Sequence, residues 1–297
     1  MTDRILIPLD GSSRSEQVLG ALRPALRRPG VEAYLLRVLD EPGDEKGSWA
    51  RKEKVARARA HLDRLQDGLA RKGITAVTAI RSGNPAREIL SFALRLRPAA
   101  IAMSTHGRSG LTRIARGSVA EEILRASPHP VLLVNAFAGA GPARRPGATR
   151  ILVPIDLAVR PDPLLDAVEK IARTFAAHVV LLHAETGPAL RSYPLVEAAW
   201  RRLRKAGVEA MTYTVRGRAE EAILRTAEAG GFDLIAMTTH GRTGADRWLH
   251  GSVTESVLRR ALCPVLTVRT REVPEGSRPP RRRETPGLRW VGSRIAP

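Results

Sequence analysis

Short apolar runs alternate with longer helical patterns along the first half of the chain. The runs are rich in aliphatic residues and predict buried strands, and the stretches between them predict helices. The expected strands are 4–10, 33–39, 76–82, 99–105 and 130–136, and the expected helices are 13–28, 48–72, 85–95 and 117–126. Such an alternation is typical of a parallel sheet that is covered by helices on both faces.

The second half repeats this alternation. Its expected strands are 150–156, 178–184, 211–217, 234–240 and 264–270, and its expected helices are 161–176, 191–206, 219–229 and 251–261. The sequence therefore predicts an α/β protein with two tandem domains, each an open five-stranded parallel sheet with helices on both faces.

One sequence pattern occurs once in each half. Residues 103–118 are MSTHGRSGLTRIARGS, and residues 237–252 are MTTHGRTGADRWLHGS. Each copy has a His-Gly pair, nine further residues and then Gly-Ser. The repetition indicates two related domains, each with the same kind of loop.

The two copies differ in length upstream of this pattern. Gly107 and Gly241 are 134 positions apart, whereas Asp10 and Asp156 are 146 positions apart. The first copy therefore has 12 extra residues, which lie within residues 38–83.

Composition shifts suggest where the domains begin and end. We expect a first domain over 1–137, a linker rich in Gly, Ala and Pro over 138–148, a second domain over 149–271 and a basic tail over 272–297. The arginine-rich tail predicts a flexible segment. The alternative is a tether to an anionic partner, with Trp290 as an anchor.

Composition favours a soluble globular protein, with 43% hydrophobic and 27% charged residues. No apolar run is long enough to span a bilayer, and no secretory signal peptide is expected. The single cysteine, Cys263, precludes an intrachain disulfide, so we expect a cytoplasmic protein without a membrane partner.

The formal net charge of +19 raises the question of nucleic-acid binding. Many of the cations lie along one helical pattern with acidic residues between them, and only 4% of residues are aromatic. Stacking platforms for single strands are therefore not evident. Nucleic acid is not expected as the main partner.

The repeated loop has the residues that hold a phosphate. A glycine such as Gly107, placed after a strand, allows close approach of the backbone to a ligand. Gly117 and Ser118 then open a helix, whose first amides and dipole favour an anion. The alternative is a purely structural turn with a capping serine. The loop is neither a Walker A sequence nor a G-x-G-x-x-G motif.

Asp10 and Asp156 end the first strand of their respective halves. In open parallel sheets, ligands bind beyond the carboxyl ends of the strands. A carboxylate there can accept hydrogen bonds from a ribose or a base amino group. The alternative is that Asp10 caps the following helix together with Ser12 and Ser13.

The sequence predicts no catalytic residue and no metal ligand. None of the histidines has zinc-binding spacing, and neither Ser118 nor Ser252 has an evident base nearby in sequence. At most, weak hydrolysis of a bound phosphate ligand is expected if Mg²⁺ accompanies the phosphates.

Four features together resemble the universal stress protein family in a tandem form. They are the P-x-D of the first strand, the H-G…G-S loop, the closing P-V-L strand, and the turn at 81–89 with its counterpart at 215–223. The resemblance covers about 2–137 and 148–271. It implies a Rossmann-like fold related to adenine nucleotide hydrolases, and a stress-response sensing or signalling role with ATP, AMP or ADP as ligand.

The resemblance also implies the residues of two nucleotide sites. In the first domain they are Pro8, Leu9, Asp10, Val38, Met103, Ser104, His106, Gly107, Gly117, Ser118 and Val119. In the second domain they are Pro154, Ile155, Asp156, Ala184, Met237, Thr238, His240, Gly241, Gly251, Ser252 and Val253.

The chain departs from the family pattern in two ways. The first glycine of the family's G-x-x-G is replaced by Ser104 and Thr238. The second domain also has a bulkier sequence after its first strand, so we expect the first site to bind more tightly.

The last expected strand of each half suggests how the protein associates with other protein surfaces. Family members dimerise through this strand, so 130–136 and 264–270 are expected to pair within one chain as a pseudo-dimer, because an exposed sheet edge needs covering. A homodimer and an unidentified protein partner are further expectations. The competing functions are a nucleotide-independent interaction module and a slow ATPase.

Overall fold

The computed structural model describes residues 3–40, 49–105, 119–135, 149–157, 159–185, 194–240 and 252–270. The chain forms two compact units, Met1–Gly139 and Ala140–Pro297. The expected linker and basic tail lie outside the described residues. No helix within the described ranges is both long enough and apolar enough to cross a lipid bilayer.

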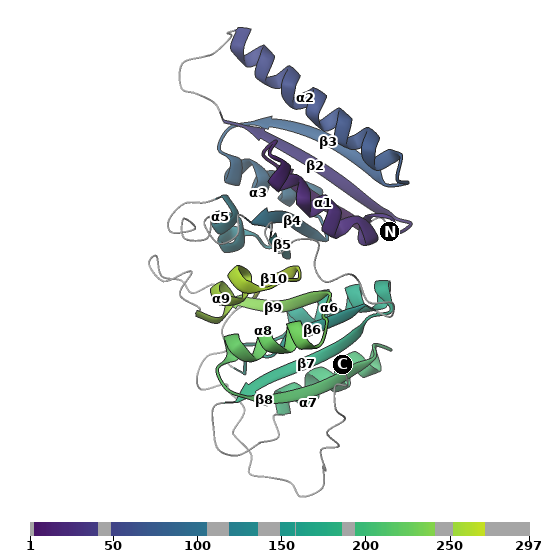
Figure 1. Cartoon of the computed structure of the whole chain (residues 1–297), viewed down its shortest axis with the longest axis vertical. Coiled ribbons are helices and arrows are strands. Elements are labelled where there is room, and N and C mark those ends of the chain that lie inside the picture. The colour runs from purple at the N-terminus through teal and green to yellow at the C-terminus, as the bar shows by residue number, and fades with distance from the viewer. Residues whose placement is uncertain are drawn as a thin grey trace, which may run out of the picture. The chain divides into compact units, whose positions relative to one another are not determined.

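Unit 1 contains a five-stranded parallel sheet in the order β3-β2-β1-β4-β5 (Figure 1). The strands are β1 (Asp3–Leu9), β2 (Val31–Leu39), β3 (Thr75–Ser82), β4 (Ala100–Thr105) and β5 (Val131–Asn135). The order reverses direction between β1 and β4, so the carboxyl ends of these two strands flank the switch point of the sheet.

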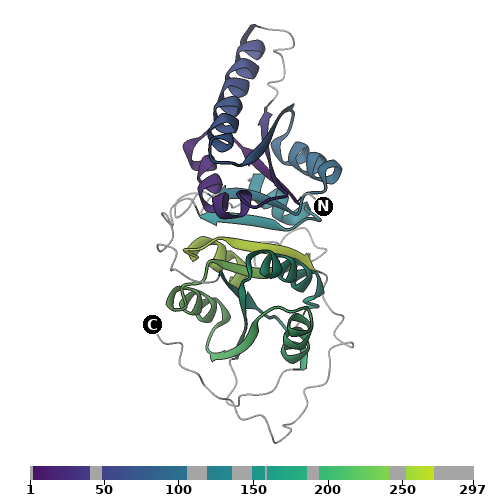
Figure 2. The ribbon, with the colours of Figure 1, turned by 90° about the vertical axis from the view of Figure 1, so that its right-hand side faces the viewer.

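Helices cover both faces of this sheet. They are α1 (Ser13–Leu26), α2 (Trp49–Ala70), α3 (Pro85–Leu96) and α5 (Val119–Ala126). Helices α1 and α2 lie on one face, and α3 packs with α5 on the other (Figures 1 and 2).

Unit 2 has the same topology, with strand order β8-β7-β6-β9-β10. Its strands are β6 (Arg150–Pro154), β7 (His178–Glu185), β8 (Ala210–Arg216), β9 (Leu234–His240) and β10 (Val265–Thr270). Its helices are α6 (Asp162–Phe175), α7 (Pro194–Lys205), α8 (Ala219–Ala229) and α9 (Ser252–Arg260). The predicted α/β class with parallel sheets is confirmed in both units.

Consecutive buried residues explain why these sheets are covered on both faces. Leu6 and Ile7 are both 0% exposed, as are Leu35 and Leu36 on the neighbouring strand. Because successive side chains of a strand point to opposite faces, burial of adjacent residues requires a layer on each side. The strands therefore form the core of each unit and leave their ends for other contacts.

The amino ends of the first strands are anchored in the same way in both units. Arg4 Nη1 donates a hydrogen bond to the Leu96 carbonyl at 3.4 Å. Arg150 Nη1 donates to the Gly230 carbonyl, at the equivalent position in the repeat. The guanidinium of Arg150 also lies over the Phe232 ring. This anchor ties the first strand to the end of the third helix of each unit.

The structure narrows the position of the 12 extra residues. Gln66 Nε2 donates to the Ala76 carbonyl at 2.7 Å, and Trp200 Nε1 donates to the Ala210 carbonyl at 2.9 Å. Gln66 and Trp200 are 134 positions apart, as are Ala76 and Ala210, which is the offset found downstream of the insertion. The 12 extra residues of the first half therefore lie before Gln66. Helix α2 accordingly has 22 residues, whereas α7 has 12.

Candidate functional site

The carboxyl end of β1 forms a glycine turn that leads directly into α1. Asp10 follows the strand, Gly11 adopts a φ of 82°, and Ser12 is the N-cap of the helix. A positive φ is easy for glycine and costly for other residues. Ser12 Oγ accepts a hydrogen bond from the Ser15 amide at 3.2 Å, which satisfies one of the free amides of the first turn.

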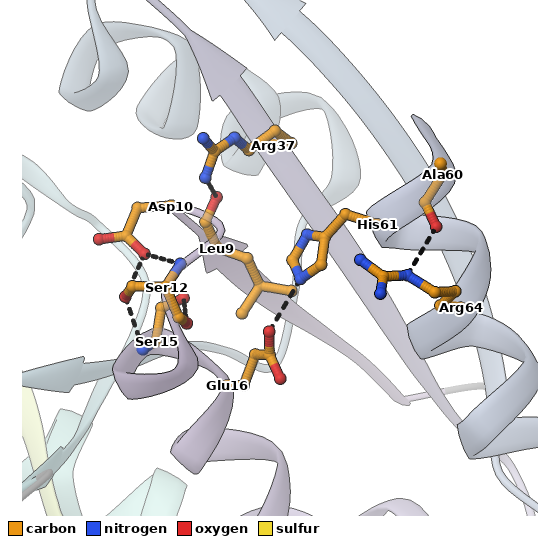
Figure 3. A network of polar contacts seen from close by, with 9 residues as sticks. All are labelled: Leu9, Asp10, Ser12, Ser15, Glu16, Arg37, Ala60, His61 and Arg64. Carbon is orange, nitrogen blue, oxygen red and sulfur yellow. Dashed lines mark hydrogen bonds and ion pairs between the residues drawn. The ribbon is translucent and has the colours of Figure 1, made fainter. Parts of the chain in front are cut away.

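Asp10 accepts two hydrogen bonds from Ser12 through the same carboxylate oxygen. Its Oδ1 accepts hydrogen bonds from Ser12 Oγ at 2.6 Å and from the Ser12 amide at 2.9 Å (Figure 3). Burial raises the pKa of Asp10, but the hydrogen bonds from Ser12 and Ser15 and the charge of Arg37 outweigh it and lower the pKa overall. The carboxyl group is therefore ionised at neutral pH. The capping alternative for Asp10 is thus observed for Oδ1, with Ser12 as its partner.

Arg37 reaches across from β2 to this turn. It is the register partner of Leu9 in the parallel β1–β2 pair, and its Nη1 donates to the Leu9 carbonyl at 3.3 Å (Figure 3). A β-carbon added to Gly11 would lie 2.7 Å from the same nitrogen, so the guanidinium lies against the bare backbone of the turn. Burial lowers the pKa of Arg37, while the charges of Asp10 and Asp40 act in the opposite direction.

Two further contacts fix the first turn of α1. His61 Nε2 of α2 lies 2.8 Å from Glu16 Oε1, and this pair links the two helices on one face (Figure 3). Ser104 Oγ at the end of β4 donates to the Ser15 carbonyl at 3.4 Å. The switch point therefore brings two of the predicted site residues, Asp10 and Ser104, to the first turn of α1.

The corresponding end of β6 in unit 2 is built differently. The Val159 amide donates to the Asp156 carbonyl at 3.4 Å, and α6 begins after Pro161, which makes no side-chain capping bond among the described residues. His183 occupies the position of Arg37 in the repeat. Its Nδ1 lies 3.4 Å from the Ile155 carbonyl, and the residue is buried.

The other predicted site residues that the structure describes lie on the expected elements. Met103, Met237 and Thr238 are buried on β4 and β9. In unit 1, Pro8 and Leu9 end β1, Val38 lies on β2, and Val119 begins α5. In unit 2, Pro154 ends β6 and Ile155 follows it, Ala184 lies on β7, and His240 ends β9. Ser252 and Val253 begin α9. Outside the described residues lie His106, Gly107, Gly117, Ser118, Gly241 and Gly251.

Comparison with known proteins identifies this arrangement. A model of the universal stress protein family matches residues 1–135 and 147–269. The chain belongs to the universal stress protein family. The two matched segments show that this universal stress protein is a tandem form, as the repeat predicted.

Individual relatives agree with this assignment. A universal stress protein of Methanocaldococcus jannaschii is 30% identical over 138 residues, which cover 44% of this chain and 81% of that protein. A universal stress protein of Bacillus subtilis is 28% identical over 148 residues, which cover 46% of this chain and 100% of that protein. The crystal structure of a universal stress protein from Archaeoglobus fulgidus has the same fold, with a TM-score of 0.73 at 22% identity over 90% of this chain and 96% of that one.

Arg37 was missed by the sequence analysis. It lies within the aliphatic run of the second strand and was assigned only a place in that strand. The repeat contains a signal for it, because the 146-position offset aligns Arg37 with His183. A basic residue at the same position of two aliphatic runs marks this position as different from its neighbours, because charged and polar side chains are uncommon in such runs.

Proposed function

We propose that this universal stress protein binds ATP, or the related nucleotides AMP and ADP, at the carboxyl end of the sheet in each unit. Its role would be sensing or signalling in the cytoplasm during stress. The observation that carries the proposal is the switch point of unit 1, where Asp10, Ser104 and the end of β2 meet at the start of α1. This is the place in an open parallel sheet where nucleotides bind.

The residues divide into two groups along the proposed ligand. Asp10 and the backbone of Val38 would contact the adenine or the ribose, with Met103 and Ser104 beneath it. The glycine loop would hold the phosphates, with Gly117 and Ser118 placed before Val119, the first residue of α5. A helix start of this kind supplies free amides and a favourable dipole to an anion. Mg²⁺, when it accompanies the phosphates, would neutralise part of their charge.

The second unit would use Asp156, Ala184, Thr238 and the loop from Gly241 to Ser252 in the same manner. We propose that it binds more weakly. The turn after β6 has no side-chain helix cap among the described residues, and it has Leu157 where unit 1 has Gly11.

Calorimetric titration of the full chain with ATP tests this proposal. We expect binding that is lost at one site in Gly117→Val and at the other in Gly251→Val, with the larger loss in Gly117→Val. The double variant should not bind. Circular dichroism of each variant controls for folding, and mass spectrometry of any small molecule that co-purifies identifies the natural ligand.

A wild-type chain that gives no heat with ATP, ADP or AMP would refute nucleotide binding and leave the interaction module as the better hypothesis. Release of ADP during prolonged incubation of the wild-type chain with ATP would add slow hydrolysis. It should be absent from the double loop variant.

A further inference from the structure

Asp10 and Arg37 place a hydrogen-bond acceptor and a donor at the same turn, which follows the carboxyl end of β1 (Figure 3). Both hydrogen bonds that Ser12 donates to Asp10 go to Oδ1, so Ser12 does not engage the second acceptor atom of the carboxylate, Oδ2. Arg37 uses one N–H group for the Leu9 carbonyl, and its remaining groups have no acceptor among those residues. The two side chains make no direct ion pair there, so neither satisfies the other (Figure 3).

The backbone holds this pair in place. The register of β1 and β2 sets Arg37 beside Leu9, and the absence of a side chain at Gly11 leaves the space that the guanidinium occupies. Arginine remains charged at any physiological pH, and Asp10 is ionised. A ligand group that bridges the two must therefore offer a donor next to an acceptor.

Adenine has this pattern on the two edges that share its 6-amino group, with N1 as the acceptor on one edge and N7 on the other. Its 6-amino group is a donor and the neighbouring ring nitrogen N7 is an acceptor. We propose that Arg37 is a specificity-determining residue of the first site: it donates to N7 of adenine while the 6-amino group donates to Asp10. This inference rests on the proposed nucleotide binding and adds to it the recognition of the base.

The second unit lacks this donor. His183 is 8% exposed, and its Nδ1 faces the Ile155 carbonyl. An imidazole at this position is shorter than an arginine side chain and has two ring nitrogens where a guanidinium has five N–H donors. Recognition of N7 by this side chain is therefore limited to unit 1, and the two sites would differ in how they recognise the base.

The probe is 7-deaza-ATP, which differs from ATP by a C–H group in place of N7. Its affinity and that of ATP are measured by calorimetry on the full chain carrying Gly251→Val, so that only the first site contributes. We expect ATP to bind about tenfold more tightly than 7-deaza-ATP, because a hydrogen bond from a charged donor is lost. In Arg37→His, which introduces the residue of the second unit, the two ligands should bind equally.

Arg37→Lys serves as the matched control for charge, because it keeps the positive charge without the planar fork. We expect it to recover only part of the preference for ATP. Equal loss of both ligands in Arg37→His would show that Arg37 only positions the turn, and would overturn the inference. Equal binding of ATP and 7-deaza-ATP by the parent chain would overturn it while leaving nucleotide binding intact. No binding of either ligand would refute both.

Discussion

The carboxyl ends of β1 and β6 are equivalent in the repeat but differ in structure. In unit 1, Gly11 makes a positive-φ turn beneath Arg37. In unit 2 the same position is Leu157, and among the described non-glycine residues only Arg97 and Ala176 have positive φ, so this turn takes another path. The amino ends keep the same arginine anchor in both units. Duplication has therefore preserved the arginine contact at the amino ends of the first strands and changed the turn at their carboxyl ends.

The starts of the helices show the same division. In unit 1, α1 is capped by the Ser12 hydroxyl and α3 by the Asn84 side chain, which accepts from the Arg87 amide at 3.0 Å. In unit 2, α8 begins after Arg218 with no side-chain capping bond among the described residues, as α6 does after Pro161. The capped starts of unit 1 lie at the carboxyl ends of β1 and β3. We therefore expect this edge to be more rigid in unit 1 than in unit 2.

Replacing Gly11 in the turn after β1 by leucine, the residue at the equivalent position after β6, is the test with the largest expected effect. Gly11→Leu forces a branched side chain into a positive-φ position, which costs about 1–3 kcal/mol, and it displaces the Arg37 guanidinium. We expect hydrogen exchange in the first turns of α1 to accelerate and ATP affinity at the first site to fall. Exchange in α6 should be unchanged.

The reciprocal variant, Leu157→Gly, is the matched control. It removes a partly buried side chain from a turn that has no positive-φ glycine. The added freedom of the unfolded chain costs roughly 0.5–1 kcal/mol, and the loss of the side chain's apolar contacts adds to this cost. Equal effects of the two substitutions on their own helices would show that the turns are equivalent after all.

The elements were predictable from sequence, but the contacts between them were not. The aliphatic strands, such as the run around Leu35, have a pattern that is typical of a doubly covered parallel sheet. The pairing of Arg37 with the Leu9 carbonyl depends on the register of two strands separated by a whole helix. The alternation along one strand restricts which face each residue takes. The offset between two strands that a helix separates also depends on how the whole unit packs.

Helix capping offers a smaller and reciprocal test of the difference between the units. Asn84→Ala removes a capping bond and should lower the stability of α3 by about 1 kcal/mol. Arg218→Asn supplies the residue found at the equivalent position and should stabilise α8 by roughly 0.5–1 kcal/mol. The measurement is native-state hydrogen exchange of the amides in each helix. If α8 gains no protection from exchange, the amides of its first turn already have hydrogen-bond acceptors, and the missing side-chain cap does not distinguish the two units.

Titration of Asp10 is the test with the smallest expected effect, because it detects the loss of a single hydroxyl group, that of Ser12. The second copy has Ala158 where the first has Ser12. Carboxyl-carbon NMR should place the Asp10 midpoint below the ordinary value of 3.8, since the hydrogen bonds outweigh burial. In Ser12→Ala the pKa should move upward, whereas Ser13→Ala, the same change one residue later, should leave it in place.

The sign of the accompanying stability change follows from this direction. A carboxyl group whose pKa is depressed by folding stabilises the fold above its unfolded pKa, and the stabilisation is lost as the pH falls through the folded pKa. The extra protection of α1 in the wild-type chain over Ser12→Ala should therefore be present at neutral pH and shrink as the pH falls below 3.8. A difference that is independent of pH would mean that Ser12 acts only as a helix cap, and that the ionised carboxylate adds nothing to the distinction between the two turns.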